Sequence, residues 1–374
     1  MPMDVPTLGV EEEFLLAAPE DGRPMPVADE VLGKVGRLAD GAAVHRELRA
    51  TQVEHATGVC TTAAQLRAQL CRGRLALSRA ATDAGCVLLA TGSPVGALRS
   101  PAEPLPPDRY ARIDAHYGDL AADYEACGCH VHVGVPDADT AVAVVNHLAR
   151  WLPVLLALSA NSPFDRGRDT GLHSWRMALQ SRFPGSGIAP HARSHAEHVR
   201  LVDSLVECGA LVDREQTFWL AWPSPRYPTV ELRVADVPLT VEGTLLQAVL
   251  SRALVATALA DLDRGVEAPP LDPQICSAAV WAATRHGLTG TLVDPLRARP
   301  LPAVRAVADL LRHAETALQA AGDYDPAHRL VRTALRDGTG SAAQRKAGPD
   351  GVVAMLASHT VPRVTSPQAG TRRE

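Results

Sequence analysis

The chain has 374 residues, of which 46% are hydrophobic and 21% are charged, so it is expected to bury a globular core. A net charge of −5 and an aromatic content of 4% argue against nucleic acid as a partner, because nucleic-acid-binding surfaces are basic and often aromatic. No secretory leader is recognised, and seven scattered cysteines suit a reducing compartment, so a cytoplasmic location is expected. Polar residues interrupt the most apolar stretch, 140–160, which favours a buried helix over a membrane span.

Hydrophobic periodicity predicts strands first and helices afterwards. The expected elements are a strand at 5–16, a helix at 62–84, a strand at 86–90, a long loop at 92–108, a strand at 127–135, a helix at 139–160 kinked near Pro153, a short helix at 174–182 between loops 161–170 and 183–192, a helix at 194–208, and strands at 217–222 and 229–235.

From residue 240 to about 358 the pattern is almost entirely helical, and residues 359–374 are expected to form a flexible tail. Strands and helices therefore do not alternate along the chain. We expect an α+β fold, in which helices cover a mainly antiparallel sheet, within a single domain over residues 1–358.

Three predicted strands place polar side chains two residues apart. Residues i and i+2 of a strand point to the same face of the sheet. One face would therefore carry three polar pairs, which are Glu11 with Glu13, His130 with His132, and Glu231 with Arg233. Carboxylates, histidines and an arginine on one face suit Mg²⁺-nucleotide chemistry.

Each pair also has a purely structural interpretation. Glu11 and Glu13 are compatible with a solvated strand edge, although two partly buried carboxylates repel each other unless a cation binds. Two histidines on an apolar-backed strand can be hydrogen-bonded in the core. Glu231 and Arg233 can form an in-strand ion pair of little consequence, and Asp236, three residues on, is a candidate to brace that arginine.

Two further features limit these interpretations. Glu54, in the segment Gln-Val-Glu-His-Ala-Thr-Gly, is by default a surface residue when it is considered alone. The sequence contains no phosphate-binding P-loop, no dinucleotide-binding glycine motif and no nucleophile elbow. A bound nucleotide would therefore be held by metal bridges and arginines on the sheet.

Five motifs in a fixed order resemble a known family. They are GVEEEF, QVEHATG, CGCHVHVGV, the SANSPF–SWR–RFPGSG stretch and TVELRVADVP, and they extend over residues 7–260. Together they resemble the type 2 glutamate–cysteine ligases, which are bacterial carboxylate–amine ligases. The resemblance implies a glutamine-synthetase-like fold, whose antiparallel sheet curves into a funnel that binds ATP and two or three Mg²⁺ ions. It also suggests a homodimer.

The resemblance implies roles for individual residues of this chain. Metal binding falls to Glu11, Glu13, Glu54, His130 and Glu231. Phosphate binding falls to Arg233, which forms the expected catalytic set with Glu231 and His130. His132, on the same face, is an expected substrate-binding residue. Arg176, in Ser-Trp-Arg, is similar to the arginine that holds the substrate's α-carboxylate.

The implied reaction has two steps. An amino-acid carboxylate, by default that of glutamate, attacks the γ-phosphate of ATP to give an acyl phosphate, and an amine, by default that of cysteine, then displaces phosphate. The loops at 92–108 and around Gly185 are candidate lids. Cys129 and the absence of a histidine beside Pro94 depart from the expected pattern, which leaves the substrates open.

Two rival functions remain. A metal-dependent hydrolase would use the two histidines, but such barrels place this motif early in a βα repeat and often use a lysine. Here the motif is in mid-chain, and Lys34 and Lys346 are the only lysines. The second alternative is a non-catalytic relative that binds a nucleotide or ligand. All the matched polar positions are intact, which argues against it.

Overall fold

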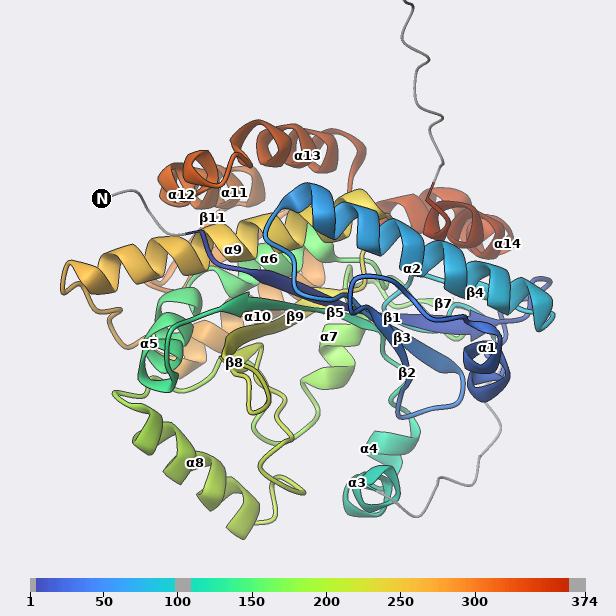
Figure 1. Ribbon diagram of the computed structural model, residues 1–374, viewed down its shortest axis with the longest axis horizontal. Coiled ribbons are helices and arrows are strands. Elements are labelled where there is room, and N and C mark those ends of the chain that lie inside the picture. The colour runs from blue at the N-terminus through green and yellow to red at the C-terminus, as the bar shows by residue number, and fades with distance from the viewer. Residues whose placement is uncertain (1–4, 98–108, 363–374) are drawn as a thin grey trace, which may run out of the picture.

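A seven-stranded sheet lies at the centre of the computed structural model, which describes residues 5–97 and 109–362 (Figure 1). Its order is β2-β3-β1-β5-β9-β8, with β4 paired to the end of β1, and each of these pairings is antiparallel. The strands are β1 (Leu8–Ala17), β2 (Ala43–Arg46), β3 (Gln52–Ala56), β4 (Val87–Leu89), β5 (Gly128–Gly134), β8 (Ala221–Pro223) and β9 (Thr229–Asp236). Two hairpins lie outside it, β6 (Phe164–Asp165) with β7 (Arg168–Asp169), and β10 (Thr291–Asp294) with β11 (Arg299–Pro302).

Helices lie on both sides of the sheet. In Figure 1, α2 and α9 cover one face, with α11, α12 and α13 further out, and α3, α4, α7 and α8 lie on the other side. The helices are α1 (Ala28–Lys34), α2 (Ala63–Asp83), α3 (Arg109–Tyr117), α4 (Asp119–Ala122), α5 (Ala138–Leu148), α6 (Leu152–Ser159), α7 (Trp175–Gln180), α8 (His195–Glu207), α9 (Val241–Asp263), α10 (Pro273–His286), α11 (Ala303–His313), α12 (Glu315–Ala320), α13 (Tyr324–Asp337) and α14 (Gly340–Thr360).

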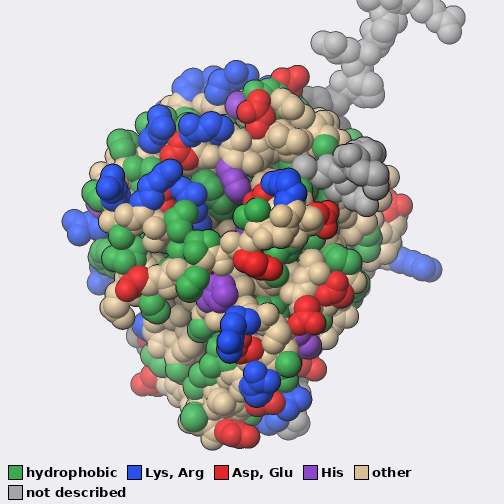
Figure 2. All heavy atoms as spheres, turned by 90° about the vertical axis from the view of Figure 1, so that its left-hand side faces the viewer, with side chains coloured by type: hydrophobic (Ala, Val, Ile, Leu, Met, Phe, Trp, Pro, Cys, Tyr) green, Lys and Arg blue, Asp and Glu red, His purple; other side chains and the backbone are tan. Residues whose placement is uncertain are grey.

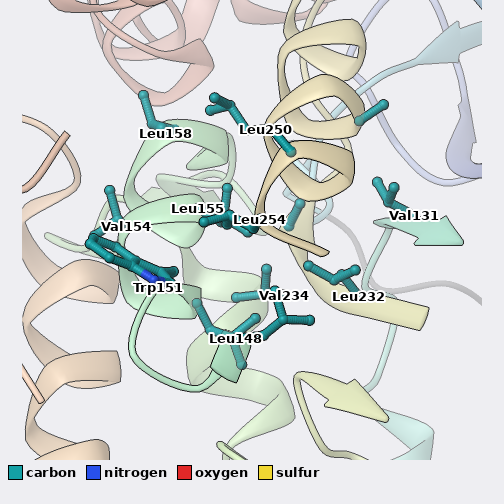
Figure 3. Close-up of a cluster of buried hydrophobic side chains, with 14 of the residues drawn as sticks. Val131, Leu148, Trp151, Val154, Leu155, Leu158, Leu232, Val234, Leu250 and Leu254 are labelled. Carbon is teal, nitrogen blue, oxygen red and sulfur yellow. The ribbon is translucent and has the colours of Figure 1, made fainter. Parts of the chain in front are cut away.

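The largest core lies between the sheet and helices α6 and α9. Val131 of β5 and Leu232 and Val234 of β9 point into it, where they meet side chains such as Leu155 of α6 and Leu254 of α9 (Figure 3). Because the side chains of a strand alternate, the histidines and carboxylates of β5 and β9 point to the opposite face. The apolar packing therefore fixes which side of the sheet carries the polar site.

The surface carries charged side chains of both signs. On the face shown in Figure 2, acidic side chains lie among the basic ones. Helix α9, and the bent pair of α5 and α6, have the length and hydropathy of a membrane span. However, 72% of the apolar window of α9 is buried inside the protein, which identifies α9 as a core helix.

The fold departs from the sequence expectations in several places. The stretch expected as one helix at 139–160 forms α5 and α6, which meet at 69°, and Pro153 lies in the first turn of α6, where its missing N–H disrupts nothing. The β10–β11 hairpin interrupts the region expected to be helical after residue 240, because its prolines conceal the strand pattern. The strand expected at 217–222 is reduced to β8.

The ends of two other expected segments are only partly described. Helix α14 continues to Thr360, two residues into the expected tail, and residues 363–374 of that tail lie outside the described residues. Residues 98–108 of the expected loop at 92–108 also lie outside the described residues.

A buried ion pair joins β1 to α2 behind the polar face. Glu12, the middle glutamate of the triplet, and Arg74 of α2 both have fully buried side chains, and Arg74 Nε lies 3.1 Å from Glu12 Oε2. Arg74 also donates to the backbone oxygens of Pro238 and Leu239, and the Thr244 hydroxyl donates to Glu12. A fully partnered arrangement of this kind offsets the cost of desolvating the two charges.

We predict that Arg74→Ala lowers the free energy of unfolding by about 3–5 kcal/mol, because it leaves the Glu12 carboxylate buried and unpaired. Urea unfolding measures the change. The control is Arg67→Ala on the same helix, since Arg67 pairs with Glu242 with both side chains about half exposed. That substitution should cost less than about 1 kcal/mol, and equal losses in the two variants would contradict the prediction.

Candidate active site

The polar face of the sheet opens into a cavity of about 580 Å³. Strands β1, β3, β5 and β9 line it, and their antiparallel register sets the side chains in opposed pairs: Glu11 with His130, Glu13 with Glu54, and His132 with Glu231. All the residues expected at the site line this cavity, except Arg176. The structure thus brings together side chains from segments more than 200 residues apart.

Glu11 lies between the two histidines. Its carboxylate oxygens are 3.2 Å from His130 Nδ1 and 3.5 Å from His132 Nε2, and His130 Nε2 is 3.6 Å from Glu13 Oε1. Burial would raise the pKa of Glu11, but the hydrogen bonds and charges of the two histidines lower it overall. For His132, burial would lower the pKa, but Glu11 and Glu231 raise it overall. The negative charge of Glu11 therefore favours the protonated form of His132.

Three overlapping groups in this cavity have ligand atoms within 4.8 Å of one another: Glu11 with Glu54 and His130, Glu11 with His132 and Glu231, and Glu13 with Glu47 and Glu54. Two of the groups contain one histidine nitrogen and the third consists of carboxylates alone, and sets dominated by carboxylate oxygens suit hard divalent cations such as Mg²⁺. Glu47 was missed by the sequence reasoning, because it lies on the turn between β2 and β3, where no alternating pattern marks it.

The third of these groups concentrates negative charge. Burial and the neighbouring charge of Glu13 raise the pKa of Glu47 from 4.5 to about 8. Burial and the charge of Glu47 likewise raise the pKa of Glu54 well above its ordinary value. Like-charged carboxylates at this spacing share protons unless a cation neutralises them, so the residues present fit a metal site.

Glu231 and Arg233 form an ion pair on β9 beside the histidines. The second carboxylate oxygen of Glu231 accepts a hydrogen bond from Trp222 Nε1 at 2.9 Å. Burial would raise the pKa of Glu231, but the charge of Arg233 contributes to lowering it overall. Glu231 is thus held ionised, and 29% of the Arg233 side chain remains exposed to the cavity side.

The expectation that Asp236 braces Arg233 is wrong. Asp236 lies opposite Gly128 of β5, beyond an irregularity in the β5–β9 register, and it is fully buried. It accepts hydrogen bonds from the backbone N–H of Asn161 at 2.8 Å and from the hydroxyls of Ser162 and Ser174 at 2.7 Å each. Ser174 in turn caps α7, the helix that carries Arg176. Asp236 therefore acts on the position of α7.

Arg176 enters a second, smaller cavity of about 100 Å³, which it shares with Glu13, His130 and Arg233. The side chain is 2% exposed, and its Nη2 donates to the backbone oxygen of Arg233 at 3.1 Å. Its Nε and Nη1 have no partner among the described residues. A Cβ at Gly128 would lie 2.4 Å from Nη2, so a larger residue at this position of β5 would displace the guanidinium of Arg176.

Of the two candidate lids, only the loop around Gly185 reaches the acidic cavity within the described residues, through Phe183. Ser186 and Gly187, next to Gly185, line a separate cavity of about 590 Å³ beside α10, and residues 92–97 line neither the acidic nor the small cavity. The other walls above the acidic face come from Arg109 and Tyr110 of α3 and from the loops at 215–218 and 224–227. These segments were not expected at the site.

Comparisons with known proteins agree with this arrangement. The sequence profile of glutamate-cysteine ligase family 2 (GCS2) matches residues 7–348. A protein of Saccharopolyspora erythraea named "Putative glutamate--cysteine ligase 2-2" is 51% identical over 367 residues, which cover 95% of this chain and 93% of that protein.

Two solved structures share the fold. A glutamate–cysteine ligase from Francisella tularensis, in complex with AMP, has a TM-score of 0.70 at 13% identity, covering 96% of this chain and 90% of that one. The prokaryotic ubiquitin-like protein ligase PafA, in complex with Pup, has a TM-score of 0.54 at 12% identity, covering 96% and 73%. The expected α+β, glutamine-synthetase-like fold is thereby confirmed. The chain belongs to glutamate–cysteine ligase family 2.

Proposed function

We propose that this protein is an ATP-dependent carboxylate–amine ligase that forms an amide through an acyl phosphate. The observation that carries the proposal is the set of three overlapping carboxylate and histidine groups in one cavity with Arg233. Membership of a ligase family and the AMP complex of a structural neighbour support it. Two or three Mg²⁺ ions held by these groups would neutralise phosphate charge.

The residues of this chain divide between the two ends of the cavity. Glu11, His132 and Glu231 form the end away from Arg176, where we place the ATP phosphates, with Arg233 bearing charge on the transferred phosphoryl group. Arg176 has unpaired guanidinium donors next to Glu13, which suits the α-carboxylate of the acid substrate.

In the first step, a carboxylate oxygen of the acid attacks the γ-phosphorus of ATP, the bond to the β,γ-bridging oxygen breaks, and ADP leaves. In the second step, the amine nitrogen attacks the acyl carbon and loses a proton, phosphate leaves, and the amide remains. The protein supplies alignment and charge stabilisation rather than a covalent nucleophile. Walls from α3 and the 224–227 loop would limit access of water to the acyl phosphate.

Glutamate and cysteine are the substrates that we propose first, because the family and the similar proteins carry their names. PafA has the same fold and is the ligase of a protein, Pup, so the fold alone does not specify the pair. We place the reaction in the cytoplasm, which supplies ATP and in which free thiols persist, since all seven cysteines are free.

We predict that ADP release from Mg-ATP requires both an acid and an amine. The test is a panel of glutamate, other amino-acid carboxylates, cysteine and other amines, with mass spectrometry of the products. An amide of one acid with one amine, formed together with ADP and phosphate, is the expected result. Nucleotide binding without ADP release for any pair would favour a non-catalytic relative, and hydrolysis of amides without ATP would favour a hydrolase.

We predict that Arg233→Ala lowers kcat by about 10²-fold or more, because it removes a positive group that stabilises the transferred phosphoryl charge. Arg233→Lys retains a charge next to Glu231 and should fold normally, yet remain slow, since lysine lacks the planar fork of donors. Steady-state kinetics with the pair found in the panel measures both variants. A wild-type kcat in folded Arg233→Ala would show that Arg233 does not stabilise the transferred phosphoryl group.

The raised pKa of Glu47 predicts how the stability of the metal-free protein depends on pH. The folded state holds a proton on Glu47 up to about pH 8, whereas the unfolded chain releases it near pH 4.5. This contribution is fully present below about pH 4.5 and is lost as the pH rises through 8. In a chelator, Tm should therefore fall more steeply between pH 5 and 8 for the wild type than for Glu47→Gln.

Thermal unfolding in EDTA at several pH values tests this dependence. Added Mg²⁺ should reduce the fall for the wild type more than for Glu47→Gln, because the cation takes the place of the proton. Parallel Tm–pH curves for the two proteins would show that Glu47 does not hold the proton.

A further inference from the structure

The small cavity at the arginine end contains a second unpartnered side chain, which the resemblance does not explain. Gln180 lines it together with Arg176, and the two residues are four apart on α7, so they lie on one face of the helix. Both side chains are buried, with 2% of Arg176 and 3% of Gln180 exposed. Gln180 Oε1, like Arg176 Nε and Nη1, has no hydrogen-bond partner in the part of the chain described.

The orientation of the Gln180 amide follows from its one hydrogen bond. Its nitrogen donates to the backbone oxygen of Phe218 at 3.1 Å. A carbonyl oxygen only accepts, so the amide nitrogen must face Phe218, which leaves Oε1 as a free acceptor. A buried acceptor without a partner costs about 1–3 kcal/mol, so its retention beside two free guanidinium nitrogens calls for a ligand that satisfies both.

Free donors and a free acceptor side by side define the chemistry of that ligand. An anion would satisfy Arg176 but not Gln180 Oε1. An α-amino acid carries a carboxylate and an ammonium group on one carbon, and it satisfies both. The cavity, at about 100 Å³, is much smaller than the sites that hold nucleotide-sized ligands, and it borders the acidic cavity at Glu13 and His130.

We propose that Gln180 determines specificity for the acid substrate, by accepting a hydrogen bond from its α-ammonium group while Arg176 holds the α-carboxylate. The acid substrate is then an α-amino acid whose side-chain carboxylate extends past Glu13 toward the metal-binding groups, and not a simple dicarboxylic acid. This inference rests on the proposed ligase function and names the class of its acid substrate.

The test compares L-glutamate with glutarate, which has the same two carboxylates but no ammonium group, and L-aspartate with succinate in the same way. The wild type should prefer the amino acid. Gln180→Leu should lower the amino-acid to dicarboxylate ratio of kcat/KM by about 10- to 100-fold, mainly through KM for the amino acid, because a hydrogen bond to a charged group is lost. Activity with the dicarboxylate should change by less than about 3-fold.

Gln180→Glu separates this role from a structural one. Glutamate retains an acceptor for the ammonium group but cannot donate to Phe218, so it should keep the preference for the amino acid. Equal losses with both substrates in Gln180→Leu and Gln180→Glu would show that Gln180 only supports the Phe218 loop, and would overturn the proposal. Gln319→Leu on α12, where Gln319 pairs with Glu315, is the control far from the cavity.

Binding measurements distinguish failure of this inference from failure of the proposed function. Titration calorimetry measures the Kd of each acid with Mg-ADP present. If no acid–amine pair releases ADP, but the wild type binds an amino acid more tightly than its dicarboxylate and Gln180→Leu does not, the inference stands and the ligase function fails. If the wild type binds neither amino acid, or binds both members of each pair equally, the inference is overturned.

Discussion

The site depends on one constraint, the two-residue period of strands packed against a single apolar core. The rear face of β5 and β9 is fixed by α6 and α9, so the front face must carry His130, His132, Glu231 and Arg233 together. The carboxylates that β1 and β3 add to this face repel each other, yet the packed strands cannot separate. Burial and this repulsion raise the pKa values of Glu47 and Glu54, whereas the two histidines lower the pKa of Glu11.

The three consecutive glutamates of β1 illustrate the same constraint. Glu11 and Glu13 face the cavity, whereas Glu12 points backward to Arg74, with neither Glu12 nor Arg74 exposed. A slip of β1 by one residue would bury Glu11 and Glu13 without partners and remove Glu12 from its arginine. The buried pair thus specifies the register of β1 in addition to joining it to α2 and, through Thr244, to the start of α9. A segment that looks uniformly acidic in sequence has two distinct roles.

Whether a site residue could be predicted depends on whether a sequence pattern within one strand marks it. The pairs on β1, β5 and β9 were predictable, because each lies within one strand and has a two-residue period. Glu54 and Arg176 required the family resemblance, since nothing local distinguishes them. Glu47 was missed because a hairpin turn, not a strand pattern, brings it to Glu54. Asp236 was expected to brace Arg233, but its carboxylate binds Asn161, Ser162 and Ser174, which lie far away in sequence. The roles of these residues in catalysis stay predictions.

The arginine end of the cavity also depends on residues that no motif contains. Gln344 of α14 donates to both the backbone and the side-chain oxygens of Asn161, at 2.8 Å each, and a Cβ at Gly340 would overlap Asn161 Oδ1. The N–H of Asn161 in turn binds Asp236, which holds the capping serine of α7. No described residue after Arg233 lines either polar cavity. The C-terminal helix nevertheless sets the position of Arg176 through these contacts, and the helical remainder of the chain is part of the site's construction.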